Sequence, residues 1–474
     1  MDSWRAELLR GRRRKTLRPT ATASQELGPP AKKDIFLLGI GMTERAQSIV
    51  MKTLLVLLSC LLAVGPAVAA VPELAPFHAR GGLPNFRAKA ERGGEVRVAY
   101  LGGSITAEEG WRTLSLEFLR ERFPRAKVAE IFAAAPGTGS DLGVCRLQAD
   151  ALRHAPDLLF VEFAVNDETA RDERVLATME GIVRQARRMR PELDICFVYT
   201  LSFRGLPDLR KGGGTRTVRV MERVAEFYGV PSVHMAATVA RRLDEGSLVF
   251  GKKDGDRCGP GQVLFTRDGV HPTAEGHRVC METLAAALPV LLGTGAPAAH
   301  GLGEPLAADN WERATIMPVA ALGRRDGWTR LPADGRHLAH QPGLIAPETW
   351  AAPEAGAALE FTTRGPVLGL AGMSTPDSGQ FSVTVDGGAP VTASFFDRFT
   401  RADFMRMTAW FYPLPLDDGA HRVRVELTGA RLDKAKIKDG PLEDAALYEG
   451  HGMFVGGALV APPDGARRES RQPR

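Results

Sequence analysis

The first part of the chain alternates short apolar runs with longer amphipathic runs. The apolar runs predict buried strands, and the amphipathic runs predict helices. The predicted strands span 96–101, 127–133, 158–164, 194–200 and 230–234. The predicted helices span 111–123, 141–154, 172–190, 215–228, 236–243 and 273–292. Strands that are apolar on both faces and separated by helices indicate a parallel sheet with helices on both sides.

The pattern changes after a Gly/Pro/Ala-rich stretch at 294–308, which we interpret as a linker. Short alternating runs then predict strands at 358–363, 367–371, 381–385, 391–396, 407–411, 422–427 and 453–460. Asp386-Gly387-Gly388 and Asp417-Asp418-Gly419 are hairpin signals. Residues 309–462 are therefore predicted to form an antiparallel, jelly-roll-like β-sandwich. The polar, basic segment 463–474 is expected to be a disordered tail.

The positive charge of the chain belongs to its N-terminal extension. Residues 1–50 hold 10 Lys/Arg and 5 Asp/Glu, which leaves 51 of 61 basic and 51 of 56 acidic residues in 51–474. Because the remainder is neutral, the sequence gives no reason to expect a nucleic-acid-binding face.

A secretory signal is predicted at 51–70. Met51-Lys52 is followed by an apolar run that ends in Ala67-Val68-Ala69, a small-x-small cleavage site. The run is short for a membrane span, so the mature chain is expected to have none and to be secreted or periplasmic. With Met51 as the start, residues 1–50 are an over-extended or disordered N-terminus.

The cysteines do not predict a metal site. No C-x-x-C spacing occurs, which argues against zinc. Cys60 would leave with the signal. Cys145, Cys196 and Cys280 are expected to be buried free thiols. Export permits a disulfide, and Cys258–Cys280 is the first pair to test for one.

Ser104 lies in Gly102-Gly103-Ser104, directly after the first predicted strand. The carboxyl edge of an open α/β sheet is where ligands bind, so Ser104 is a candidate nucleophile. Taken alone, it is equally a residue that begins a helix.

Asp268 and His271 follow the last strand–helix connection, in Asp268-Gly269-Val270-His271-Pro272. A carboxylate three residues before an imidazole can hold its tautomer while the ring faces a serine. The same spacing also suits an ordinary surface turn.

Gly137 and Asn166 each follow a predicted strand. The backbone N–H of Gly137 and the side-chain amide of Asn166 are candidate donors to an oxyanion, although turn formation explains each of them separately. Together with Ser104, Asp268 and His271, they should converge on one sheet edge.

These blocks make the chain resemble the SGNH/GDSL hydrolase family. The resemblance covers residues 90–293 and implies a flavodoxin-like three-layer α/β/α domain with esterase or acyltransferase activity and no metal or other cofactor. It implies Ser104 as nucleophile, His271 as base and Asp268 as its partner. It also implies an oxyanion hole formed by the Ser104 N–H, Gly137 and Asn166. Gly103 departs from the family, in which many members carry Asp.

Residues near Ser104 extend the predicted site. Thr106, Glu108 and Trp111 are expected to line the pocket, and His277 to lie in a helix near it. In the sandwich, the aromatic residues either stack on sugars or pack in the core; they are Phe395, Phe396, Phe399, Trp410, Phe411 and Tyr412.

The sequence therefore predicts hydrolysis of a small acyl ester. We favour an O-acetyl group on carbohydrate, by analogy with exported esterases of this family that carry a β-sandwich. The alternatives are a lipid or lysophospholipid esterase, an O-acyltransferase, and a non-catalytic carbohydrate-binding protein. An apolar lid would favour the lipid reading, but the 246–262 stretch is mostly polar.

Overall fold

The computed structural model describes residues 75–211, 213–253, 255–332, 348–402, 405–442 and 444–463. The predictions for residues 1–50, for the signal at 51–70 and for the tail from 464 onward lie outside these residues. The described helices include none that is both long enough and apolar enough to cross a bilayer.

The first domain is built on one mixed sheet whose strands are mostly parallel. Its strands are β1 (Phe77–His78), β2 (Gly94–Gly102), β3 (Ala126–Ala134), β4 (Leu158–Glu162), β5 (Asp194–Tyr199) and β6 (Ser232–His234). Their order is β1-β6-β5-β4-β2-β3, and only β1 runs antiparallel to its neighbour. The five parallel strands, numbered along the chain, have the flavodoxin-like order 2-1-3-4-5. The strand order reverses between β2 and β4, where such sheets bind ligands.

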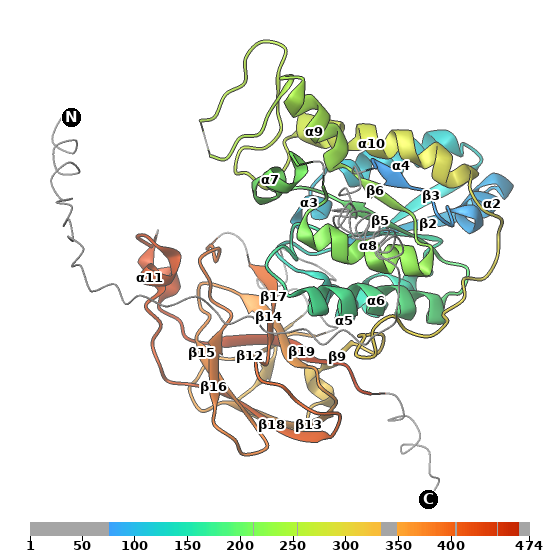
Figure 1. The fold of residues 1–474 in the computed structure, drawn as a ribbon. Helices are drawn as coiled ribbons and strands as arrows, with labels where there is room; N and C mark the ends of the chain where they lie inside the picture. The colour runs from blue at the N-terminus through green and yellow to red at the C-terminus, as the bar shows by residue number, and fades with distance from the viewer. Residues whose placement is uncertain are drawn as a thin grey trace, which may run out of the picture. The chain divides into compact units, whose positions relative to one another are not determined.

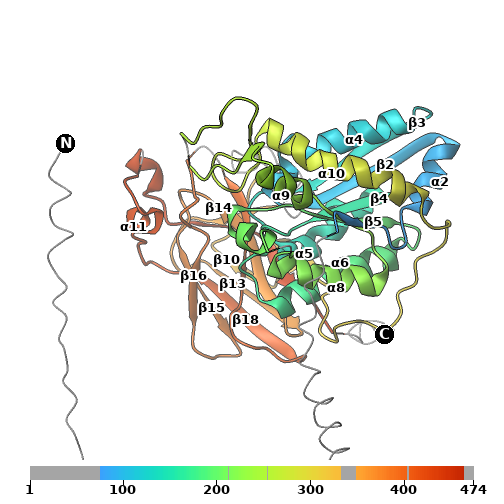
Figure 2. The same ribbon diagram turned by 45° about the horizontal axis from the view of Figure 1, so that its top comes forward.

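Helices cover both faces of this sheet (Figure 1). One face carries α5 (Ser140–Asp150), α6 (Asp172–Met189) and α8 (Arg216–Tyr228). The other carries α2 (Pro84–Arg92), α4 (Trp111–Arg122), α9 (Ala236–Asp244) and α10 (Ala274–Gly293), and Figure 2 shows α4 and α10 over the sheet. The three-layer fold expected from the family resemblance is therefore present.

The central strand β4 shows why the pattern predicted this arrangement. Leu159 and Val161 are buried with the α5/α6/α8 face, whereas Leu158 and Phe160 are buried with the opposite face. Successive side chains of a strand point to opposite sides, so a strand between two helical layers needs apolar residues at every position.

The predicted boundaries of the long elements differ from the observed ones by a few residues. The largest difference is the helix predicted at 141–154, which is α5 followed by the short 3-10 helix η1 (Leu152–His154). The sequence missed α2 and several short elements: α3 (Ser104–Ala107), α7 (Leu206–Leu209), and the paired strands β7 (Leu248–Val249) and β8 (Val263–Leu264).

The second domain consists of two antiparallel sheets. One has the order β10-β13-β18-β15-β16, and the other β11-β12-β19-β14-β17 with β9 paired to β19. The seven predicted strands are β13 (Ala358–Arg364), β14 (Leu368–Ser374), β15 (Gln380–Val385), β16 (Val391–Ser394), β17 (Arg406–Phe411), β18 (Ala420–Leu427) and β19 (Met453–Val460). Four short strands were missed: β9 (Thr315–Pro318), β10 (Arg324–Asp326), β11 (Thr329–Arg330) and β12 (Trp350–Ala352).

Only one of the two hairpin signals makes a hairpin. Asp386-Gly387-Gly388 joins β15 to β16, which pair with each other, and Asp386 and Gly387 have positive φ angles of 53° and 74°. The prediction for Asp417-Asp418-Gly419 is wrong, because β17 and β18 belong to different sheets. A turn sequence determines that the chain reverses, but not whether the next strand pairs with the previous one.

The segment interpreted as a linker is held against the first domain. The carboxylate of Glu180, on α6, accepts hydrogen bonds from the backbone of Leu306 and Ala307, the latter at 2.7 Å. Further on, the guanidinium of Arg174 lies 4.8 Å from the ring centroids of both Trp311 and Phe411, so α6 also contacts β17.

Candidate active site

Ser104 is the first residue of α3, immediately beyond the carboxyl end of β2. The preceding turn requires glycine. A Cβ on Gly103 would lie 2.0 Å from Oδ1 of Asn166, and one on Gly102 would lie 2.4 Å from Oγ1 of Thr106. The glycine at 103, which departs from the resembled family, therefore lets the Asn166 amide lie directly beside Ser104.

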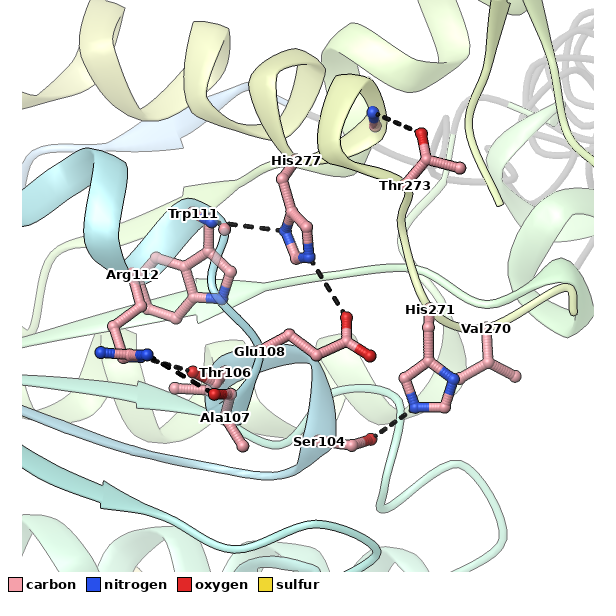
Figure 3. Close-up of polar contacts among 12 residues, drawn as sticks. Ser104, Thr106, Ala107, Glu108, Trp111, Arg112, Val270, His271, Thr273 and His277 are labelled. Carbon is pink, nitrogen blue, oxygen red and sulfur yellow. Dashed lines mark hydrogen bonds and ion pairs between the residues drawn. The ribbon is translucent and has the colours of Figure 1, made fainter. Parts of the chain in front are cut away.

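The loop before α10 brings His271 to Ser104. Nε2 of His271 lies 2.8 Å from Oγ of Ser104 (Figure 3), and its Nδ1 lies 2.6 Å from Oδ2 of Asp268. An ionised carboxylate only accepts hydrogen bonds, so Nδ1 carries the proton and Nε2 can accept the serine proton. The structure thus places the three predicted residues in one line of hydrogen bonds.

Asp268 is held as a carboxylate by its own loop. Its Oδ1 accepts hydrogen bonds from the backbone N–H of Val270 at 2.9 Å and of His271 at 2.8 Å. Partial burial opposes ionisation, but these bonds and the one from the His271 ring lower the pKa of Asp268 below its ordinary value. A carboxylate that stays ionised can fix the His271 tautomer.

Gly137 and Asn166, the two predicted oxyanion donors, lie on neighbouring connections. Gly137 has a φ of 71° in the loop after β3, a conformation that glycine adopts without strain. Asn166 lies four residues beyond β4, which ends two residues earlier than the predicted strand 158–164. Its amide lies against Gly103, next to the Ser104 backbone.

The second domain reaches this loop, which was not predicted from the sequence. Arg406, at the start of β17, lies so close to Gly137 that a Cβ there would be 2.9 Å from its Nη1. Arg406 is nine-tenths buried and forms an ion pair with Asp397. The guanidinium therefore supports the Gly137 loop from the sandwich side.

The buried carboxyl group of Glu162 is hydrogen-bonded to α3. Its Oε2 accepts a hydrogen bond from Oγ1 of Thr106 at 3.0 Å, and its Oε1 one from Oγ1 of Thr200 at 2.6 Å. Burial raises the pKa of Glu162 to about 7, although these hydroxyl groups act in the opposite direction. Glu162 ends an otherwise apolar strand, and that single charged position was the signal that could have identified it.

Asp167 orders the loop beside Asn166. Its Oδ1 accepts a hydrogen bond from the Ser140 N–H at 3.0 Å, which connects the start of α5 to this loop. Burial, and then the charge of Asp141, raise the pKa of Asp167 to about 7.

Two of the three residues predicted to line the pocket do not. Thr106 and Trp111 are fully buried, Thr106 on Glu162 and Trp111 in the core beneath α4. A helix of only one turn directs successive side chains in very different directions, which spacing alone does not reveal. Glu108 remains partly exposed, and its carboxylate lies 3.3 Å from Nε2 of His277 (Figure 3).

Cys258 and Cys280, the pair considered for a disulfide, do not form one. Cys258 is exposed, whereas Cys280 is buried on α10, and both are free thiols. Cys145 and Cys196 are buried free thiols, as expected. In the described part of the chain, His, Cys, Asp and Glu form no group of three or more that could hold a metal ion.

Most aromatic residues of the sandwich pack internally rather than forming a stacking surface. Phe395 and Phe396 are buried, and Trp410 and Tyr412 pack on the sandwich core. Phe411 contacts Trp311 with ring centroids 5.5 Å apart. Phe399 differs, because 61% of it is exposed.

Comparisons with known proteins agree with this architecture. Residues 100–279 match the GDSL-like Lipase/Acylhydrolase family model. A two-domain esterase active on acetylated mannans, solved with mannopentaose, is 20% identical with a TM-score of 0.61, covering 81% of this chain and 97% of that one. Another structure of a two-domain esterase active on acetylated mannans has a TM-score of 0.62 at the same identity and coverage. Such similarity shows a shared two-domain fold. No curated protein matches the chain.

Proposed function

We propose that the chain is a serine esterase, because its residues 100–279 match the GDSL-like Lipase/Acylhydrolase family model. It removes small acyl groups, acetyl above all, from carbohydrate. The observation that carries the proposal is the hydrogen-bonded line from Ser104 through His271 to Asp268 at the point where the strand order reverses.

In the proposed mechanism, Ser104 attacks the ester carbonyl carbon while Nε2 of His271 takes the hydroxyl proton. Asp268 stabilises the imidazolium that results. The oxyanion is bound by the N–H groups of Ser104 and Gly137 and by the Asn166 amide. His271 then returns the proton to the leaving alcohol, and an acyl-enzyme remains. Water, deprotonated by His271, attacks the acyl carbon and releases the acid and free Ser104.

Carbohydrate is the substrate class that we propose, on two grounds. The structurally similar two-domain esterase is active on acetylated mannans. In addition, the described residues of the stretch 246–262 are largely exposed and polar, unlike the apolar lid of a lipase. Because the sequence at 51–70 has the form of a secretory signal, we also propose that the enzyme acts outside the cytoplasm, where polymeric carbohydrate is found.

The test is a substrate panel measured on the full chain and its Ser104→Ala variant. We expect p-nitrophenyl acetate and acetylated polysaccharides to be hydrolysed, rates to fall as the acyl chain lengthens, and Ser104→Ala to lose about 10³-fold or more in kcat. Preference for long acyl chains or lysophospholipids would replace the carbohydrate proposal with a lipid one. Transfer of acetyl to added alcohol in preference to water would identify an acyltransferase.

A further inference from the structure

We propose that Glu108 is a substrate-binding residue that accepts hydrogen bonds from free hydroxyl groups on the alcohol part of the ester, and that His277 is the positioning residue that holds it. The inference rests on the proposed function, since it concerns the same site. Glu108 would recognise a polyhydroxy alcohol. The Ser104–His271–Asp268 line does not itself select the alcohol part of the ester.

Glu108 directly follows the helix turn that carries Ser104. Its backbone N–H donates to the Ser104 carbonyl oxygen at 3.0 Å. Figure 3 shows its carboxylate between the imidazoles of His277 and His271, on the side of α3 that Ser104 faces. The Glu108 side chain is 42% exposed, so a bound ester can reach this carboxylate.

The contacts of His277 suit it to position Glu108 rather than to react with the substrate. Its side chain is only 3% exposed, and the backbone N–H of Trp111 donates to its Nδ1 at 3.3 Å. Because that N–H can only donate, Nδ1 carries no proton and the ring proton is on Nε2. Nε2 therefore donates to Oε2 of Glu108, at 3.3 Å.

The contacts of the His277 ring leave Nδ1 as an acceptor and Nε2 as the donor to Glu108. A hydrogen on Nδ1 would point directly at the Trp111 N–H, so the donor of the ring is Nε2. Gly110 is also fitted to the ring, because a Cβ there would lie 2.3 Å from Cγ of His277. No lysine or arginine of the described residues forms an ion pair with Glu108. A negative acceptor is thus fixed beside the candidate nucleophile.

A carboxylate in this position selects the alcohol part of the substrate by charge and hydrogen bonding. It only accepts hydrogen bonds, and one of its oxygens is already used by His277, so the other is free for a donor. The hydroxyl groups of a sugar are neutral donors. A phosphorylated headgroup brings negative charge toward Glu108 and is disfavoured.

The experiment measures Glu108→Ala on substrates that differ in free hydroxyl groups. They are a methyl glycoside with a single O-acetyl group, the same glycoside fully acetylated, and p-nitrophenyl acetate. We expect kcat/KM on the mono-acetylated glycoside to fall about 10- to 100-fold, the range for a lost hydrogen bond to a charged group, mainly through KM. The other two substrates should change by less than about 2-fold. Glu109→Ala, which removes the neighbouring exposed carboxylate, should change none of them.

Variants of His277 test its positioning role. His277→Phe should reproduce the selective KM effect, His277→Gln should restore part of the activity because its amide can still donate, and adding Glu108→Ala to His277→Phe should cost little more. Equal losses on all three substrates would overturn the inference while leaving the proposed function intact. Failure of the unsubstituted enzyme to hydrolyse either glycoside would overturn both.

Discussion

Two histidine–aspartate pairs of the described residues have nearly the same inner geometry, in which Nδ1 of the ring faces the carboxylate. In the first domain, Nδ1 of His271 lies 2.6 Å from Asp268, and in the sandwich, Nδ1 of His421 lies 2.8 Å from Asp386. The two pairs differ at the outer nitrogen. Nε2 of His271 faces the Ser104 hydroxyl, whereas Nε2 of His421 faces the backbone carbonyl of Asp417 at 3.1 Å.

That difference determines what each imidazole can do. A carbonyl only accepts, so both nitrogens of His421 donate and the imidazolium is favoured. The hydrogen bond to Asp386 raises the pKa of His421, although burial acts in the opposite direction. His421 is thus a structural cation on β18, while His271 keeps a lone pair for the serine proton. A His–Asp pair becomes a candidate base only where its outer nitrogen is left to accept.

Replacing each of the two histidines in turn should give the largest difference in kcat between the two pairs. His271→Ala is expected to lower kcat for p-nitrophenyl acetate about 10³-fold or more, because Ser104 loses its base. The matched variant His421→Ala removes the same side chain from the other pair and should change kcat by less than about 2-fold. Comparable losses in the two variants would show that the histidines affect activity through folding alone.

A smaller effect is expected at the contact between the two domains. Gly137→Ala adds a Cβ at a φ of 71° and 2.9 Å from Arg406, so the loop must shift and its N–H with it. We expect kcat to fall about 10- to 100-fold, below the full loss of an oxyanion donor. Adding Arg406→Ala should recover part of this loss. An unchanged kcat in Gly137→Ala would show that the Gly137 N–H does not bind the oxyanion.

The smallest expected effect is on the stability of the fold, and it tests whether His421 is protonated there. Its pKa is raised in the folded state, so its contribution is complete below the unfolded value of about 6.5 and is lost as the pH rises through the folded value. The urea midpoint of the unsubstituted protein should therefore exceed that of His421→Gln most at pH 5, and the gap should narrow toward pH 9. A gap independent of pH would mean that His421 is not protonated in the fold.

The sequence predicted the parts of the site that local pattern determines. Ser104 and Gly137 each follow an apolar run, and Asp268 and His271 share one loop, so strand ends and short spacing were enough to bring them to one sheet edge. The element order of the first domain followed for the same reason.

What the sequence could not predict depends on the direction of side chains and on distant contacts. Thr106 was expected in the pocket but is buried, because its hydroxyl donates to Glu162 on another strand. Trp111, also expected there, packs in the core against Tyr100 and Phe160. Arg406 reaches Gly137 from the second domain. Asp386 was correctly predicted in a hairpin, yet its partner His421 comes from the neighbouring strand β18.

The central claim is that Ser104 is the nucleophile activated by His271, and covalent labelling tests it most directly. The full chain and its His271→Ala variant are treated with a fluorophosphonate ester, which phosphonylates activated serines with loss of fluoride, and the adduct is located by peptide mass spectrometry. We predict one adduct, on Ser104, that forms in step with loss of esterase activity and at least about 10²-fold more slowly in His271→Ala. Complete loss of activity with the adduct on another residue, or equal labelling rates in the two proteins, would contradict the account.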